Sequence, residues 1–298
     1  MWAAGSRSME SSVALSGSLL AATLLSLVVL GAESTRTRRG SDGDEDRGRR
    51  PWRTAEAVAV AVAFGFAGLV AILVWNALLV SVVRGVAGAD STLRRTVVLQ
   101  VSNGLGTVTG AVLYLQYAER GWEYVDLRRP TRLDAGYGFA GLVVIGGTFV
   151  AVNAAMRVFG IEGAAHGTSD LLAETANPAL LTGVFVVTSV LVIGPGEELL
   201  YRNVVQKSLY DEFSRPVSVV LASVVFAAVH FSAYADGTPL QVLTSLTVVF
   251  ALSLTLGAVY ERTDNVLVPA VVHGLFNASQ FALIAASETD VLAVALLP

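Results

Sequence analysis

Long apolar segments separated by short charged loops constrain this chain more than any other feature of its sequence. Eight such segments can be drawn, at residues 13–32, 57–83, 96–117, 135–156, 179–200, 216–232, 240–260 and 265–285. Each is close to the roughly 17–25 residues that a helix needs to cross a bilayer. Closed barrels also satisfy every backbone hydrogen bond in lipid, but these segments lack the alternation of barrel strands. The sequence therefore predicts an all-α fold, a polytopic transmembrane bundle of about eight helices.

Composition agrees with a membrane environment and excludes several classes of site. Charged residues make up 15% of the chain, whereas soluble domains usually carry about 25%. The chain has no cysteine, which excludes disulfides and thiolate chemistry. Basic residues lie in loops and form no stripe for nucleic acid, so no nucleic-acid partner is expected.

A hydrophilic linker at residues 33–53, with seven arginines and five acids, follows the first segment. This composition is typical of a disordered tether. Three arginines follow the first segment, whereas a signal peptide carries its positive charge before the apolar run. We therefore expect a retained helix. We predict three parts: residues 1–53 as a helix with a linker, 54–120 as two accessory helices, and 121–298 as the core.

The distribution of Lys and Arg predicts an orientation. With the N-terminus outside, the cytoplasmic loops would carry fourteen basic residues and the outer segments five. Because cytoplasmic loops are enriched in Lys and Arg, we expect a multi-pass protein of the cell membrane with its N-terminus outside.

Ionisable side chains inside a bilayer are costly, and this chain places several in its second half. Residues 194–202 read GPGEELLYR, in or beside the fifth apolar segment. Glu198 and Arg202 are four residues apart, so they share a helix face and can pair. Glu197 would point about 100° away, toward a cavity. Because of Pro195, we expect the helix to break or bend just before the glutamates.

Two further apolar segments carry the other candidate site residues. His230 ends the sixth, four residues after Phe226, whose ring should pack beside the imidazole. His273 and Asn277 lie four residues apart in the eighth. Counted along helices, Glu197 and both histidines fall at similar depth and could face one pocket. We assign no role to His166, which lies in a polar loop.

This set of side chains can support hydrolysis in two ways. A carboxylate in a partly apolar pocket can act as a general base toward water, while the imidazoles and the amide orient that water and stabilise an oxyanion. Alternatively, His230 and His273 could hold a divalent metal such as zinc, whose bound water Glu197 deprotonates. No HExxH motif is present, which excludes a standard zincin arrangement.

At these residues the chain resembles the CPBP family, the CAAX prenyl endopeptidases and bacteriocin-processing (Abi-type) intramembrane proteases. The family's EExxxR, FxxxH and HxxxN/D motifs read EELLYR (197–202), FAAVH (226–230) and HGLFN (273–277) here. The segment GWEYVDLRRP (121–130) is similar to the loop that leads into the site in that family. The resemblance covers roughly residues 120–285.

The resemblance implies an intramembrane endopeptidase that acts on membrane-associated or prenylated proteins or peptides, in contact with membrane lipid. Glu197 would activate water, with or without a metal. The site would open toward the cytoplasmic half of the membrane. The implied site residues are Glu197, Glu198, Arg202, His230, His273 and Asn277.

Two other classes of function remain open from the sequence. One is a non-enzymatic membrane protein, such as an immunity factor or scaffold that kept the site. The other is a proton-coupled transporter, although no inverted repeat of broken helices is visible.

Overall fold

The computed structural model describes residues 51–87, 91–158, 160, 163–164, 175 and 177–288. The chain divides into two compact units, Met1–Ala55 and Glu56–Pro298. The predicted first span, the linker up to residue 50 and His166 lie outside the described residues.

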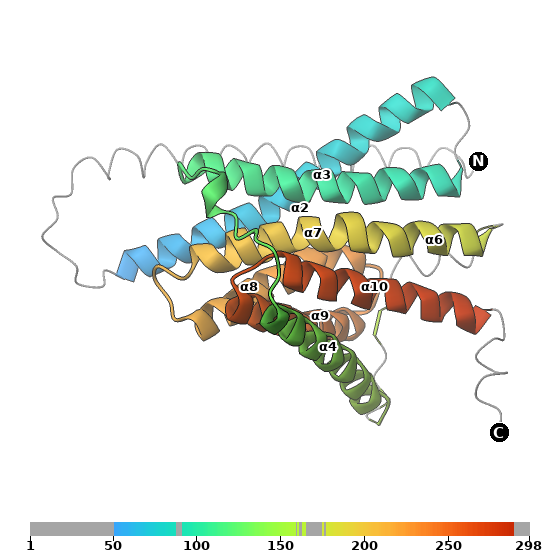
Figure 1. Ribbon diagram of the computed structural model, residues 1–298. Helices are drawn as coiled ribbons and strands as arrows, with labels where there is room; N and C mark the ends of the chain where they lie inside the picture. The colour runs from blue at the N-terminus through green and yellow to red at the C-terminus, as the bar shows by residue number, and fades with distance from the viewer. Residues whose placement is uncertain are drawn as a thin grey trace, which may run out of the picture. The chain divides into compact units, whose positions relative to one another are not determined.

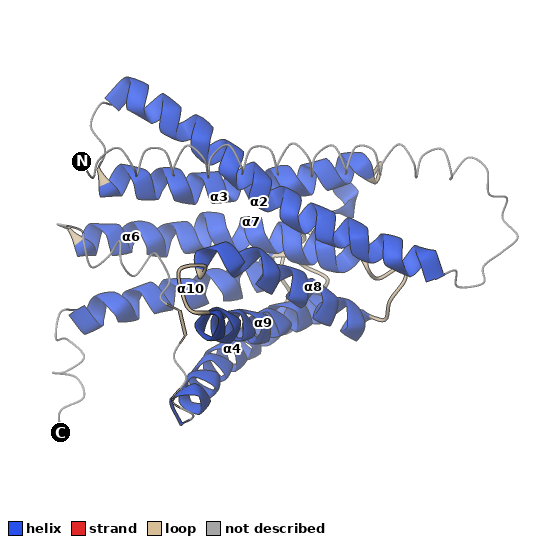
Figure 2. Cartoon of the chain, turned by 180° about the vertical axis from the view of Figure 1, so that it is seen from behind, coloured by secondary structure: helices blue, strands red, loops and turns tan. Residues whose placement is uncertain are grey.

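Every regular element in the described residues is a helix (Figures 1 and 2). Seven of these helices are long and apolar enough to cross a membrane, judged by length and composition. They confirm the all-α prediction and coincide with seven of the eight predicted spans. In chain order they are α2 (Pro51–Ala87), α3 (Thr92–Tyr117), α4 (Arg132–Val158), the continuous run Pro178–Gln206, α8 (Arg215–Val229) with the short η4 (His230–Ala233), α9 (Pro239–Thr263) and α10 (Leu267–Glu288).

The run Pro178–Gln206 departs from the expected break at Pro195. It passes without interruption through α6 (Pro178–Thr188), η2 (Ser189–Ile193), α7 (Gly194–Glu198) and η3 (Leu199–Gln206). The segments η2 and η3 are π-helical, and the N–H of Gly194 reaches back five residues to the carbonyl of Ser189. The wider turn accommodates a proline that an α-helical turn would exclude. Of the two expected outcomes, a break or a bend, the break is wrong, because the helix widens and continues.

Glycines allow α2, α3 and the run Pro178–Gln206 to approach closely. A Cβ on Gly106 of α3 would collide with the backbone of Ile72 of α2, and one on Gly110 would lie 3.0 Å from the Cα of Gly68. This is the close packing that the Gly106–Gly110 spacing predicts, and it occurs within a single bundle.

The helix α10 joins the two sides of the bundle. It packs against α4, α6, α7 and α9, and an apolar cluster of Ile145, Leu256, Val272 and Phe276 ties it to α4 and α9. The helix α7 packs against α10 on one side and against α3 on the other, so it lies between these two helices (Figure 1). The glutamates of α7 are thereby placed between two neighbouring helices.

Candidate active site

The centre of the candidate site is a buried chain of three side chains. Glu198 and Arg202 form the expected ion pair, with 2.8 Å between Oε2 and Nε and both side chains 0% exposed. The other oxygen of Glu198 lies 2.9 Å from Nδ1 of His273 on α10. A carboxylate paired with a guanidinium only accepts hydrogen bonds, so His273 donates through Nδ1. In the neutral ring Nε2 is then left as an acceptor.

Arg202 is held by two further contacts. Its Nη1 donates to Ser253 Oγ of α9 at 3.1 Å, and its Cζ lies 5.0 Å from the centre of the Phe226 ring. The charge of Glu198 is therefore neutralised by a partner that is itself fixed from two helices.

Glu197 is turned away from Arg202, as the helical spacing predicts. Its Oε1 accepts a hydrogen bond from Nδ2 of Asn103 on α3 at 3.3 Å. Its Oε2 lies 3.9 Å from Nε2 of His273, beyond direct hydrogen-bond distance. Glu197 and His273 are both buried. Two acceptor atoms thus face each other across a gap that a single water can bridge.

His230 approaches this centre through Phe226. The expected packing is present, with the two ring centres 4.5 Å apart, and the ring of Phe226 also contacts His273 edge-on at 6.0 Å. The carbonyl of Phe226 accepts from Nδ1 of His230 at 2.7 Å. His230 is therefore oriented by its own helix, and the ring of Phe226 contacts both histidines.

The structure brings four of the six predicted site residues into direct contact or close approach. These four are Glu197, Glu198, Arg202 and His273. Within the described part of the chain, no hydrogen bond or ion pair joins His230 or Asn277 to either glutamate. Asn277 lies one helical turn beyond His273 on α10 and is partly exposed.

The donor atoms do not fit the metal site that the sequence left open. Among the described residues, no three His, Asp or Glu side chains are grouped so that they could hold a metal ion. The Nδ1 bonds of His273 and His230 leave each Nε2 free to bind a metal, but no third ligand accompanies them in the described residues. Catalytic zinc sites usually have three protein ligands. We therefore derive no step through a metal.

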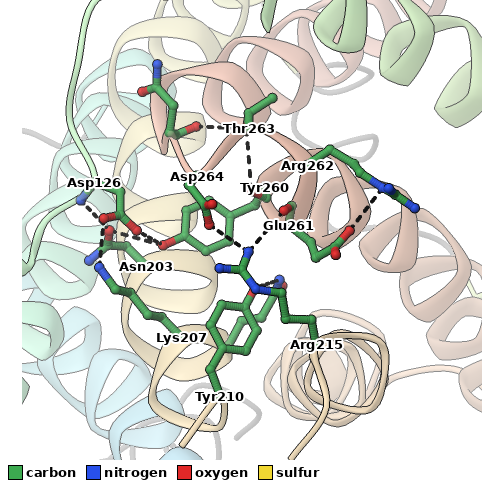
Figure 3. Close-up of polar contacts among 12 residues, drawn as sticks. Asp126, Asn203, Lys207, Tyr210, Arg215, Tyr260, Glu261, Arg262, Thr263 and Asp264 are labelled. Atoms are coloured by element: carbon green, nitrogen blue, oxygen red, sulfur yellow. Dashed lines mark hydrogen bonds and ion pairs between the residues drawn. The ribbon is translucent and has the colours of Figure 1, made fainter.

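Beside the site, the loop between α3 and α4 is fastened at Asp126 (Figure 3). Its carboxylate accepts from Lys207 Nζ at 2.7 Å and from the Tyr260 hydroxyl at 2.6 Å. Its backbone N–H donates to Asn203 Oδ1 at 2.7 Å, and its carbonyl accepts from the N–H of Val266 at 2.8 Å. One residue of the loop is thus tied to η3, to α9 and to the segment before α10.

Neighbouring residues of this loop are also held. Lys207 Nζ contacts the carbonyl of Tyr124 at 2.7 Å, and burial raises the pKa of the Tyr124 phenol well above its ordinary value. Arg128 makes a bidentate pair with Asp134, at 2.6 and 2.9 Å, and this hydrogen-bonded pairing raises the pKa of Arg128. The guanidinium stays charged near neutral pH, so the Arg128–Asp134 pair does not change there. The anchor at Tyr124 is a backbone carbonyl, which does not titrate.

This loop forms one wall of an apolar cleft of about 650 Å³. Trp122, Val125 and Leu127 of the loop line the cleft together with residues that include Leu199 of η3 and Leu267 of α10. Neither Glu197 nor His273 lines the cleft. The cleft shares η3 and α10 with the site and lies beside it.

Several residues outside the predicted set also contact or border the site. Asn103, a neutral polar residue of the α3 span, donates to Glu197 itself, whereas Gln100 on the same helix donates to Thr188 outside the site. Asn153, another neutral polar residue within a span, bonds instead to the carbonyl of Phe149 on its own helix. Asn203 and Lys207 carried a usable signal, since two polar residues four apart at the end of a membrane helix share one face.

Comparison with known proteins gives one match. Residues 179–279 match the family described as Type II CAAX prenyl endopeptidase Rce1-like. No curated protein and no solved structure matched the chain. The matched range contains all six predicted site residues, whereas Asn103 and the loop at Asp126 precede it. The chain therefore carries, at residues 179–279, an Rce1-like domain of the CPBP family of CAAX proteases.

Proposed function

We propose that this protein is an intramembrane endopeptidase of the CAAX-protease type, in which Glu197 activates the attacking water. The observation that supports this most is the buried chain Arg202–Glu198–His273, which presents an imidazole nitrogen to Glu197. A purely structural ion pair would not need a second carboxylate on the far side of the histidine.

The first step uses the 3.9 Å gap between Glu197 Oε2 and His273 Nε2. A water in this gap donates one hydrogen to each acceptor, which turns its lone pairs toward a scissile carbonyl. Glu197 removes a proton as the water oxygen bonds to the carbonyl carbon. The same proton then passes to the leaving nitrogen as the C–N bond breaks.

The remaining site residues serve this step in two ways. Glu198 holds the Nδ1–H tautomer of His273, and Arg202 holds Glu198 as the anion that can accept this bond. Asn277 stabilises the oxyanion through its amide N–H, and Nε2 of His230 is the ring nitrogen left free to contact the substrate. The Phe226 carbonyl supports the role of His230 because it fixes which ring nitrogen is free.

The proposed substrate is a membrane-associated protein or peptide that carries a lipidated cysteine near its C-terminus. The name of the matched family supports a prenylated substrate, and the apolar cleft beside the site supports one with a greasy group. We propose that the site opens toward the cytoplasmic half of the membrane.

The test is cleavage of a peptide ending in a farnesylated Cys-aliphatic-aliphatic-X sequence by the full chain in liposomes. We expect mass spectrometry to show loss of the three residues after the cysteine. Asp236→Asn, at an exposed loop position outside the site, is the matched control and should cleave at the parent rate. A peptide that stays intact in the presence of folded protein contradicts the proposal.

A further inference from the structure

Asn103 is the one side chain hydrogen-bonded to Glu197 among the described residues, and it lies outside the matched domain. It belongs to α3, whereas the match begins at residue 179. Its Nδ2 lies 3.3 Å from Glu197 Oε1. A carboxylate only accepts hydrogen bonds, so the amide nitrogen must be the atom that faces it.

The backbone brings these two residues together by a close approach of glycines. Gly104 follows Asn103, and Gly196 precedes Glu197. A Cβ on Gly196 would collide with Thr107 Oγ1 and lie 3.5 Å from the Cα of Gly104. Because both positions lack side chains, α3 and α7 touch at this level, and the residue before Gly104 meets the residue after Gly196.

Only the nitrogen of the Asn103 amide is hydrogen-bonded within the described residues. Asn103 Oδ1 is buried and has no hydrogen-bond partner among the described residues. Gln100, one turn earlier on α3, instead donates to Thr188 Oγ1 at 2.7 Å, a bond far from either glutamate. Within the described residues, the side chain of Asn103 therefore bonds to Glu197 alone.

We propose that Asn103 is a positioning residue for Glu197, so that an accessory helix completes the active site; this rests on the proposed function. The amide holds Oε1 and thereby fixes the plane of the carboxylate. Oε2 is then directed at His273 Nε2, across the gap in which the attacking water is activated. Without the amide, the carboxylate can rotate about its terminal torsion, which is broad and two-fold.

The test compares Asn103→Leu, which is close in size but has no amide, with the parent in liposomes, using the farnesylated peptide. We expect kcat to fall by about 10–100-fold, the usual cost of losing a residue that orients a site, while KM changes less than about threefold. Asn103→Gln keeps the amide and should recover part of kcat. Gln100→Leu, which breaks the neighbouring interhelical bond of α3, should keep kcat within about threefold.

Three outcomes separate the inference from the proposed function. If the parent cleaves, Glu197→Gln does not, and Asn103→Leu keeps the parent kcat, the inference is overturned and the function stands. An equal loss of kcat in Gln100→Leu and Asn103→Leu also overturns it, because any break in α3 packing would then suffice. If the parent does not cleave the peptide, or Glu197→Gln cleaves at the parent rate, both fail. Thermal unfolding of each variant in detergent identifies any loss of kcat that is caused by misfolding. Where Asn103→Leu does not fold, the kcat of a folded Asn103→Gln protein is the measurement that decides.

Discussion

Arg202 is the largest fully buried side chain in the described residues, and its partner Glu198 is equally buried. Charges removed from water are tolerated only when paired and hydrogen-bonded. Here the pairing continues to Ser253 and to His273. At the scale of single residues, the same contacts that neutralise the pair also orient the imidazole that faces Glu197.

Removing one charge of this pair should therefore cost much stability. Arg202→Met leaves the Glu198 carboxylate buried without its cation, and we expect a loss of about 3–5 kcal/mol in unfolding free energy. The measurement is denaturant unfolding in detergent micelles.

The matched control removes both charges. Glu198→Leu combined with Arg202→Met should recover much of the stability, yet cleavage should stay low because His273 Nδ1 has lost its acceptor. An Arg202→Met protein as stable as the parent would show that the pair contributes little.

At the scale of elements, glycine contacts decide how closely helices approach. Gly106 of α3 lies against the backbone of Ile72, whereas Gly147 of α4 has no atom within 4 Å of the position a Cβ would take. We expect Gly106→Ala to destabilise the protein by about 1–3 kcal/mol, because a backbone cannot move aside cheaply. Gly147→Ala should be neutral or slightly stabilising, since alanine favours helix. Melting temperatures in detergent that rank the two variants in reverse would refute this packing.

The loop fastened at Asp126 should affect substrate binding more than chemistry. Asp126→Asn weakens the contacts to Lys207 and Tyr260 and loosens the wall of the apolar cleft. We expect KM for the farnesylated peptide to rise about tenfold, near the worth of one hydrogen bond to a charged group, with kcat within about threefold. Asp211→Asn, an exposed residue between η3 and α8, is the control. A fall in kcat at constant KM would place Asp126 in the chemical step instead.

Most of the helices could be predicted because crossing a lipid bilayer imposes a strong hydrophobic pattern on the sequence. A span needs a long apolar run, and seven such runs became helices at nearly the predicted residues. The course of the chain at Pro195 could not be predicted, since proline usually interrupts a helix and the π-helical turns that accommodate it leave no pattern in the sequence.

The site was predictable where its residues share one helix. The Glu198–Arg202 pair and the Phe226–His230 contact follow from a spacing of four. The partner of Asn103 does not, because nothing in the sequence says which face of α3 meets α7. Contacts between distant segments depend on the assembled bundle, and there the sequence carried only the hint of a polar residue within an apolar span.

At the scale of the whole molecule, the account predicts which side of the membrane each loop occupies. The chain contains no cysteine, so a single introduced one reports its own position. With the N-terminus outside, Asp211→Cys should react with a membrane-impermeant maleimide only from the cytoplasmic side. Asp236→Cys, in the loop before α9, should react only from the outside. Labelling of both from the same side would contradict the orientation, whatever the activity.

The proposed function depends on Glu197 as the base that activates water, and the kcat of a Glu197→Gln variant measures that role. Glu197→Gln keeps the shape of the side chain and its contact distance to Asn103, but it cannot take a proton. We predict that kcat for the farnesylated peptide in liposomes falls by about 10²–10⁴-fold, the usual contribution of a general base. Unfolding should stay close to that of the parent. A folded Glu197→Gln protein that cleaves within threefold of the parent rate would contradict the account.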